Sequence, residues 1–313
     1  MVTDAHPDAA FEPGVSVLQE LVGHQGGVYD LVLNGAGDLI SAGGDGLIVR
    51  WKRNAQGFGE RGEALVQAGE PLFCLGLTAS GRLMAGTASG ALLEEVETAP
   101  WKRQQRHEGG TLVITDEATG GADGRWLNRR DGTVRAVFPG RIRCAMDASV
   151  AAAHSESAAL SGTWVGTSEG SIHHVEAGWI LPAHEGAVRA LLPWPDKAAI
   201  ASVGADGRLV LWKAKGAGEP ERLLSINAHK GSIYRLAGDA DGRWMATCSR
   251  DRSVGLWNAS TLDLTHRLAR PAYPGHTRSV NALCWTGKRT WASAGDDGRI
   301  LIWSMDAGGE PSF

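Results

Sequence analysis

Short apolar runs separated by tight-turn residues fill most of this 313-residue chain. The stretch from Gly275 to Trp303 predicts three short strands joined by turns, because its apolar runs are bounded by Gly, Asp and polar residues. An earlier stretch has the same layout in its runs VYDLVLN, DLISAGG and LIVRWKR, and Asp45-Gly46 between the last two is a two-residue hairpin signal. Many short strands with Gly-rich turns predict an all-β fold.

Four side chains recur in these strands at nearly constant offsets. A Ser or Thr stands four residues before an Asp, a Trp stands six residues after it, and a His leads the Asp by 21 or 22 residues. The four sets are His24, Ser41, Asp45 and Trp51; His184, Ser202, Asp206 and Trp212; His229, Thr247, Asp251 and Trp257; and His276, Ser293, Asp297 and Trp303. Such self-similarity indicates a repeat protein.

This register resembles that of the WD-repeat β-propellers, whose repeat runs about 40–45 residues from a Gly-His start to a Trp-Asp end. The resemblance extends over nearly the whole chain, and the short chain is similar to stand-alone bacterial members that are all propeller. It implies seven blades, each a four-stranded antiparallel sheet. The positions equivalent to the Trp are 51, 95, 137, 175, 212, 257 and 303.

Three of the seven expected blades depart from the complete set. The residues expected in the places of the hydroxyl, the turn Asp and the Trp are Ala85, Ser89 and Glu95 in blade two, Leu127, Asp131 and Val137 in blade three, and Val165, Glu169 and Val175 in blade four. His107 is the expected His of blade three, although it leads Asp131 by 24 residues.

The expected domain organisation is one propeller over residues 14–304 between flexible tails at 1–13 and 305–313. In this family the first strand usually completes the last blade, so residues 15–20 are expected to pair beside the strand at 299–304. That pairing removes a sheet edge that would otherwise expose unpaired backbone groups. Residues 151–159 have a helix-favouring composition but are expected to form a turn region.

The repeated polar sets predict structural networks. A buried Asp must be hydrogen-bonded or paired, and a His, a hydroxyl and an indole N–H can satisfy it and one another. A His, a hydroxyl and an Asp resemble a hydrolase triad. A catalytic site is needed once, however, and this set occurs four times. These His residues are therefore expected to be neither catalytic bases nor metal ligands.

The resemblance implies a binding surface on the narrower, top face of the ring, where WD-repeat proteins commonly bind partners, often peptides. Gly44 and Ala205 also fall at positions of this face. Tyr and Arg are enriched at binding hot spots. The alternative is an ordinary polar rim around a solvent-filled channel. The expected partner-binding residues are Tyr29, Phe73, Arg189, Tyr234, Arg250, Asn281 and Asp296.

Charge is distributed unevenly along the chain. Residues 101–143 hold nine basic and five acidic residues, whereas residues 58–100 hold two basic and six acidic ones. Adjacent blades of opposite sign suit a partner with matching charges, and the alternative is solvated faces that partly neutralise each other. The possible basic rim consists of Arg125, Arg129, Arg130 and Arg135.

Composition and motifs limit the remaining classes of function. A net charge of −4 makes nucleic acid an unlikely partner, because a nucleic-acid scaffold carries a strongly basic face. The four Cys lie in apolar runs and are expected to be buried thiols. The adjacent His173 and His174 point to opposite faces of a strand, so they are not a metal pair. No phosphate loop, metal helix, secretory signal or membrane-length apolar run occurs.

The sequence therefore predicts a cytoplasmic, non-catalytic scaffold or adaptor that presents its top face to protein or peptide partners within a larger complex, without cofactor or metal. One alternative is an enzyme or small-ligand binder that uses the central channel. A second alternative is binding of a polyanion or phosphopeptide through the Arg-rich rim.

Overall fold

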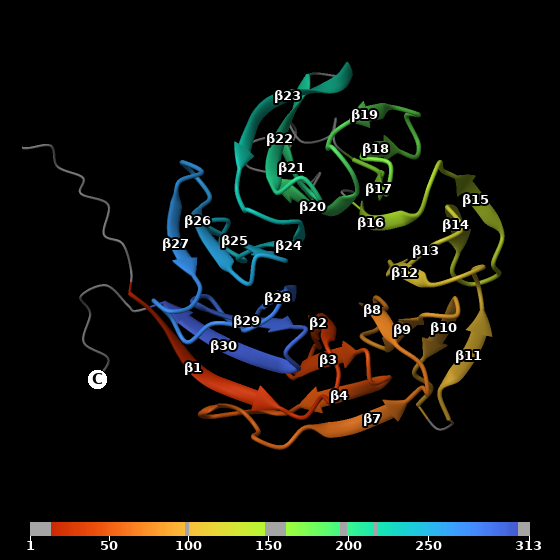
Figure 1. Ribbon diagram of the computed structural model, residues 1–313. Helices are drawn as coiled ribbons and strands as arrows, with labels where there is room; N and C mark the ends of the chain where they lie inside the picture. The colour runs from red at the N-terminus through yellow and green to blue at the C-terminus, as the bar shows by residue number, and fades with distance from the viewer. Residues whose placement is uncertain (1–13, 98–99, 148–160, 195–198, 216–217, 306–313) are drawn as a thin grey trace, which may run out of the picture.

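The structure is a computed structural model that describes residues 14–97, 100–147, 161–194, 199–215 and 218–305. These residues form seven four-stranded antiparallel sheets arranged as blades around a common axis (Figure 1). The predicted seven-bladed propeller is therefore confirmed. The expected tail at 1–13, the turn region at 151–159 and the expected tail at 305–313 lie outside the described residues, except Met305, which is buried in β30. Among the described residues, no helix is long and apolar enough to cross a membrane.

Each blade runs from an inner strand beside the axis to an outer strand at the rim. Blade one holds β2 (Val28–Leu33), β3 (Leu39–Gly43), β4 (Leu47–Trp51) and β7 (Glu63–Gln67), with a small hairpin of β5 (Arg53–Asn54) and β6 (Gly57–Phe58) inserted. Blade two holds β8 (Leu72–Leu77), β9 (Leu83–Thr87), β10 (Ala91–Glu94) and β11 (Lys102–Gln105). Blade three holds β12 (Thr111–Ile114), β13 (Ala118–Gly121), β14 (Arg125–Asn128) and β15 (Val134–Val137).

The remaining four blades follow the same order around the ring. Blade four holds β16 (Ile142–Asp147), β17 (Thr163–Thr167), β18 (Ser171–His174) and β19 (Ile180–Pro182). Blade five holds β20 (Val188–Trp194), β21 (Ala199–Gly204), β22 (Arg208–Lys215) and β23 (Gly218–Asn227). Blade six holds β24 (Ile233–Gly238), β25 (Trp244–Ser249), β26 (Val254–Asn258) and β27 (Leu264–Leu268). Blade seven holds β28 (Val280–Trp285), β29 (Thr290–Gly295), β30 (Arg299–Met305) and β1 (Val15–Val22).

The ring closes through the two ends of the described chain. β1 pairs antiparallel with β30, with Val15 opposite Met305 and Val22 opposite Arg299. The Arg299 guanidinium donates to both carboxylate oxygens of Glu20 at 2.5 Å. The predicted closure is therefore confirmed, and it pairs the outward edge of β30 with a strand from the other end of the chain.

The hydrophobic core lies between neighbouring blades. One cluster joins blades seven and one through residues that include Leu21, Trp51 and Ile300, and another joins blades five and six around Val203 and Trp257. Trp51, Trp291 and Trp303 have no exposed surface. Each blade therefore buries both faces, and no blade holds a complete core of its own.

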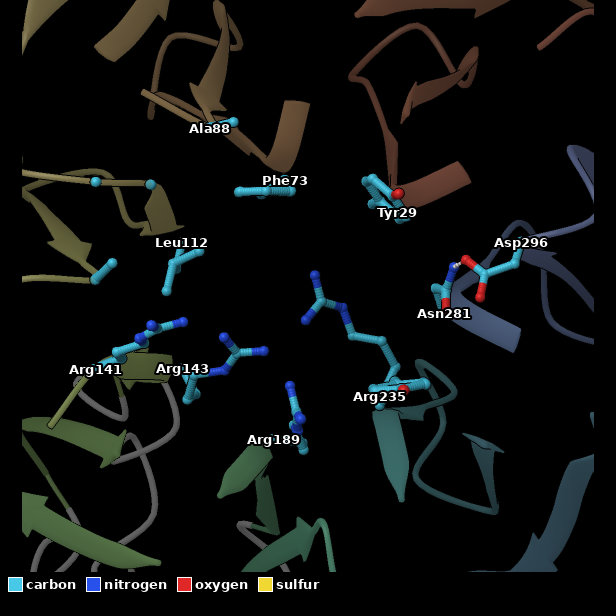
Figure 2. Close-up of a pocket in the computed structure, with 14 residues that line it drawn as sticks. Tyr29, Phe73, Ala88, Leu112, Arg141, Arg143, Arg189, Arg235, Asn281 and Asp296 are labelled. Atoms are coloured by element: carbon cyan, nitrogen blue, oxygen red, sulfur yellow. Dashed lines mark hydrogen bonds between the residues drawn. The ribbon is translucent and has the colours of Figure 1, made fainter. Parts of the chain in front are cut away.

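A β-bulge interrupts the pairing near the start of every inner strand. The register shifts at Val28/Asp30, Leu72/Cys74, Thr111/Val113, Ile142/Cys144, Val188/Ala190, Ile233/Arg235 and Val280/Ala282. A bulge re-aims the side chain of the extra residue, and here all the extra residues line one cavity (Figure 2, which labels each of them except Tyr234). We call them the bulge ring: Tyr29, Phe73, Leu112, Arg143, Arg189, Tyr234 and Asn281.

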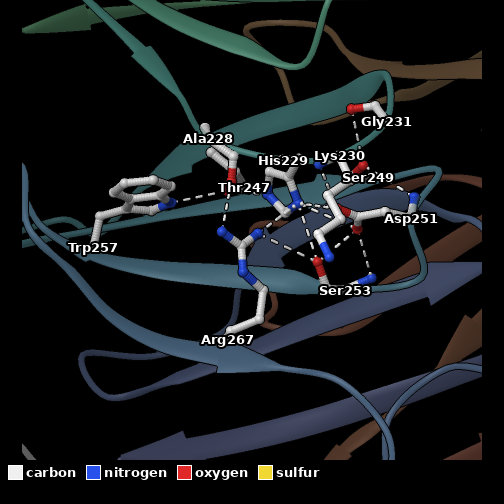
Figure 3. Close-up of polar contacts among 10 residues, drawn as sticks. All are labelled: Ala228, His229, Lys230, Gly231, Thr247, Ser249, Asp251, Ser253, Trp257 and Arg267. Carbon is white, nitrogen blue, oxygen red and sulfur yellow. Dashed lines mark hydrogen bonds and ion pairs between the residues drawn. The ribbon is translucent and has the colours of Figure 1, made fainter.

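The four predicted polar sets form the expected networks. In blade six, His229 Nδ1 lies 3.0 Å from Asp251 Oδ2, His229 Nε2 lies 2.8 Å from Thr247 Oγ1, and the Trp257 indole donates to the same hydroxyl at 2.8 Å (Figure 3). Blades one, five and seven repeat these contacts with distances of 2.8–3.1 Å. Every polar group in such a network has a partner, so the network holds the blade's strands and preceding loop together.

The charges of these networks follow from burial and hydrogen bonding. Burial lowers the pKa of His184 and of His229, which favours the neutral imidazole whose Nδ1–H donates to the carboxylate. Burial opposes ionisation of Asp297, but its contacts with His276 and its hydrogen bonds from the backbone N–H groups of Thr277 and Arg299 outweigh that effect and lower the pKa of Asp297 to about 2.

The expected layout of blade three is wrong. His107 Nδ1 contacts Asp123 at 3.0 Å, and its Nε2 contacts Thr119 at 3.0 Å. The turn between the two central strands is therefore Asp123-Gly124, and Asp131-Gly132 joins β14 to the outer strand β15. Val137 lies on that outer strand, so it does not hold the Trp place. The sequence interpretation took the outer hairpin for the inner one because the connection from His107 to β13 is shorter than in the complete sets.

With the corrected register, blade three keeps three of the four network residues. Its Trp place, six residues after Asp123, is held by Arg129. Arg129 pairs with Glu94 of blade two, and its Nε donates to the Asp116 carbonyl at 2.6 Å. An ion pair between blades two and three therefore replaces the indole. In blades two and four, the buried Ala85 and Val165 stand in the hydroxyl places and need no hydrogen bond.

We expect Asp206→Ala to lower the free energy of unfolding by about 1–3 kcal/mol, because His184 and two backbone N–H groups lose their acceptor. Urea unfolding measures the loss. Asp241→Ala is the matched control, since the one ion pair of Asp241 within the described residues is with its neighbour Arg243 in an exposed hairpin, and this substitution should change stability by less than about 0.5 kcal/mol. Equal effects of the two substitutions would refute a structural role for the network.

Candidate functional site

A cavity of about 610 Å³ lies on the propeller axis. All seven residues of the bulge ring line it. Its wall also contains Ala88, Ala122 and Asp296, which directly precede the turn residues Ser89, Asp123 and Asp297. The cavity therefore lies at the end of the channel where these turns gather, which we call the top face.

The structure brings six of the seven predicted partner-binding residues to this cavity. They are Tyr29, Phe73, Arg189, Tyr234, Asn281 and Asp296. The seventh, Arg250, lines an adjoining recess that shares Tyr29 and Asp296 with the cavity. The predicted residues thus form one continuous concave surface.

Aromatic side chains form one wall of the cavity. The rings of Tyr29 and Phe73 lie 5.9 Å apart between centroids and are tilted by 49°. Burial, with the nearby charges of Asp296 and Asp45, raises the pKa of Tyr29, so its hydroxyl stays protonated at neutral pH. Leu112 continues this wall on blade three (Figure 2). The wall offers apolar area with one hydroxyl donor.

Arginine side chains form the opposite wall (Figure 2). Arg143 and Arg189 belong to the bulge ring in blades four and five, and Arg141 is the residue directly before strand β16 in blade four. Burial and then the charges of Arg189 and Arg141 lower the pKa of Arg143 to about 10. Burial lowers the pKa of Arg189 as well, and its guanidinium carbon stands 5.2 Å from the ring centre of Tyr234.

A fourth arginine in the cavity is neutralised within the fold. Arg235 Nη2 lies 2.9 Å from Asp30 Oδ1, and this charge raises the pKa of Arg235. Asp30 also accepts the backbone N–H of Leu75 at 2.8 Å. The pair ties blades one, two and six together below the bulge ring. Arg235 therefore has a carboxylate partner within the fold, whereas Arg141, Arg143 and Arg189 form no ion pair among the described residues.

The recess beside the cavity contains three more exposed arginines, Arg250, Arg252 and Arg278. Arg252 has a φ of 72°, a left-handed conformation that costs an L-residue roughly 1–2 kcal/mol. The equivalent residue in the other six blades is a glycine with a φ between 72° and 94°: Gly46, Gly90, Gly124, Gly170, Gly207 and Gly298. Blade six therefore tolerates backbone strain at the position that puts a guanidinium on the top face.

The predicted basic rim is partly neutralised. Arg129 is buried and paired with Glu94, and Arg135 Nη1 lies 3.2 Å from Glu117 Oε2. Arg125 and Arg130 are exposed and have no ion pair among the described residues. Among the described residues of blades three and four, unpaired guanidinium groups therefore stand both at the rim, in Arg125 and Arg130, and in the cavity, in Arg141 and Arg143.

Sequence reasoning missed Leu112, Arg141, Arg143 and Arg235. It carried no top-face position to blades three and four because their polar sets are incomplete. A signal was nevertheless present: Ile142 begins an inner strand as Val28 and Val188 do, and the residue after each of these apolar residues belongs to the bulge ring. The offset holds without the network, because it depends on the bulge.

The adjacent histidines and Cys144 do not line the cavity. The imidazole of His173 packs on the Phe138 ring, with 4.9 Å between ring centroids, and that of His174 packs on the Trp164 ring, with 4.4 Å between ring centroids. The two imidazoles therefore have different neighbours. Burial raises the pKa of the Cys144 thiol to about 12. In the part of the chain that the structure describes, no group of three or more His, Cys, Asp or Glu side chains is placed to hold a metal ion.

Comparison with known proteins agrees with this architecture. The family described as WD40 (WD domain, G-beta repeat) matches residues 15–52, 176–213, 220–258 and 269–304. These are the regions that contain the four complete networks. The crystal structure of the WD40 β-propeller domain of Doa1 superimposes with a TM-score of 0.77 at 16% identity, and the match covers 96% of this chain and all of that one.

Curated relatives share shorter segments. The chain is 32% identical over 124 residues to the tRNA (34-2'-O)-methyltransferase regulator WDR6 of Drosophila melanogaster, covering 35% of this chain and 12% of the relative. It is 32% identical over 114 residues to the ribosome biogenesis protein WDR12 homolog of Chlamydomonas reinhardtii (34% and 24%) and 26% identical over 157 residues to the Drosophila LST8 homolog (46% and 49%). The chain thus spans less than half the length of these relatives.

Four blades match the WD40 repeat, a fifth keeps three of the four network residues, and the whole ring has the fold of a WD40 propeller. The chain is a member of the WD-repeat β-propeller family.

Proposed function

We propose that this protein is a non-catalytic scaffold that binds a segment of a protein partner in the top-face cavity and its adjoining recess. The observation that carries the proposal is the bulge ring. Seven strands each direct one side chain into one concave surface, and three of these residues are aromatic and two are arginines. Aromatic and arginine anchors in a pocket are typical of binding hot spots.

The rigidity of the fold supports the role of a scaffold with a preformed binding surface. Cores between the blades, the polar networks and the ring closure hold the bulge ring on rigid strands, so a partner meets a preformed surface and loses less free energy in ordering it. Relatives of the chain carry names such as ribosome biogenesis protein and small nuclear ribonucleoprotein protein, which supports a place within a larger assembly.

The test is capture of partners from the native cell by the wild type and by a variant with Tyr29, Arg189, Tyr234 and Arg250 all changed to Ala. The matched control changes four exposed residues of the outer strands to Ala: Val137, Ile180, Leu223 and Leu264. We expect a partner that the wild type and the control recover and the top-face variant loses, with all three proteins melting within a few degrees of one another. Equal recovery by the top-face variant would show that the partner binds elsewhere.

Arg252 offers a second test, because it separates binding from stability. We expect Arg252→Gly to weaken partner binding while the free energy of unfolding stays equal or rises by up to about 1 kcal/mol, since glycine adopts the positive φ without strain. Arg252→Lys should restore most of the binding because it restores the charge. If Arg252→Gly left binding unchanged and lowered stability, Arg252 would be a structural residue with no role in the recess.

A further inference from the structure

Three cations in the axial cavity lack a counter-charge. The side chains of Arg141, Arg143 and Arg189 make no ion pair and no side-chain hydrogen bond within the described residues, and Arg189 Nε is buried without a hydrogen-bond partner. A buried donor without a partner costs free energy, and like charges held close together repel. A fold that keeps all three arginines at one wall is therefore poised for an anion that satisfies them.

Arginines of the two neighbouring blades, three and six, do have carboxylate partners. Arg129 pairs with Glu94, Arg135 with Glu117, and Arg235 with Asp30. The single carboxylate on the cavity wall, Asp296, accepts a hydrogen bond from Asn281 at 2.7 Å and lies on blade seven (Figure 2). It is not within ion-pair distance of the three arginines. The cavity therefore keeps an excess of positive charge beside blades four and five.

The number and type of the cations indicate the anion. A guanidinium presents its N–H donors in a planar fork that suits carboxylate or phosphate oxygens. One carboxylate has two oxygens, which one or two arginines satisfy. A phosphate monoester has three terminal oxygens and a charge of about −1.5 to −2 at neutral pH, which matches three converging guanidinium groups better.

The rest of the cavity indicates what the phosphate is attached to. A volume of about 610 Å³ lies in the range of small-molecule sites and is larger than a phosphate ion needs. Tyr29 and Phe73 face the arginines across this space, and Leu112 lies between the two walls beside Arg141 (Figure 2). Aromatic rings pack favourably against other planar apolar groups.

We propose that the axial cavity binds a phosphate monoester, with the phosphate held by Arg141, Arg143 and Arg189 and a planar apolar group packed against Tyr29 and Phe73. The phosphate is carried either by a free small molecule or by a side chain of the partner segment. The inference deepens the proposed function because it concerns the same face, but it is tested without any protein partner.

The test is calorimetric titration of the whole protein with phenyl phosphate, inorganic phosphate and phenol at constant ionic strength. We expect phenyl phosphate to bind more tightly than inorganic phosphate, and phenol not to bind measurably. Arg143→Gln with Arg189→Gln should weaken phenyl phosphate on the order of tenfold for each guanidinium removed. The variant with Arg143→Lys and Arg189→Lys should bind phenyl phosphate with an affinity between those of the glutamine variant and the wild type, because it keeps the positive charges but loses the planar guanidinium donors.

The exposed pair Arg125 and Arg130 provides the discriminating variant, since changing both to Gln removes the same charge from the neighbouring rim. Retained binding in this variant and lost binding in the cavity variant supports the proposal. The reverse result, or a wild type that binds no phosphate compound, overturns it. Equal affinities for phenyl phosphate and inorganic phosphate overturn the part that concerns the aromatic wall.

A melting control and a titration with a phosphopeptide complete the test. The cavity variant should melt no lower than the wild type without ligand, because it loses like-charge repulsion and a buried unpaired donor, so lost binding will not reflect unfolding.

A pentapeptide that contains phosphotyrosine identifies the source of the phosphate. Binding tighter than that of phenyl phosphate assigns the phosphate to a partner segment, and weaker binding assigns it to a free small molecule. If partner capture fails but phenyl phosphate binds at the arginines, the scaffold proposal fails and the cavity inference stands.

Discussion

The pairing of β1 with β30 is the contact on which the rest of the molecule depends. It joins the two ends of the described chain and removes an edge that would otherwise expose unpaired backbone groups. The bulge ring consists of one residue from each blade, so its seven side chains converge only when all seven inner strands surround one axis. The candidate site is consequently a property of the closed ring and of no single blade.

The polar networks and the bulges have separate tasks. A network such as that of His276, Ser293, Asp297 and Trp303 fixes a loop onto its own blade. The polar side chains of the network hydrogen-bond to one another. Blades two and four lack it and still keep the four-stranded sheet and the bulge. The repeated residues therefore maintain the blade, whereas the bulged residue, which differs from blade to blade, gives the axial cavity its two chemically different walls.

Sequence reasoning predicted the fold because its strongest signal is local and periodic. The offsets among His24, Ser41, Asp45 and Trp51 return in three further blades, and the strand at 15–20 needs a partner. Blade three was misplaced because Asp123-Gly124 and Asp131-Gly132 are both good hairpin signals, and only tertiary packing of His107 decides between them. The pairing of Arg235 with Asp30 joins residues 205 positions apart across blade seven, and no local pattern carries that information.

Site-specific photocrosslinking in the native cell distinguishes a partner bound at the bulge ring from a partner bound on the side of the propeller. A photoreactive amino acid placed at Leu112 reports on the cavity, and the same residue placed at Val137 reports on the exposed outer strand of the same blade. If the bulge ring is the binding surface, position 112 yields a discrete crosslinked species and position 137 yields none. A species from position 137 with none from position 112 would contradict that proposal and would place the binding surface on the side of the ring.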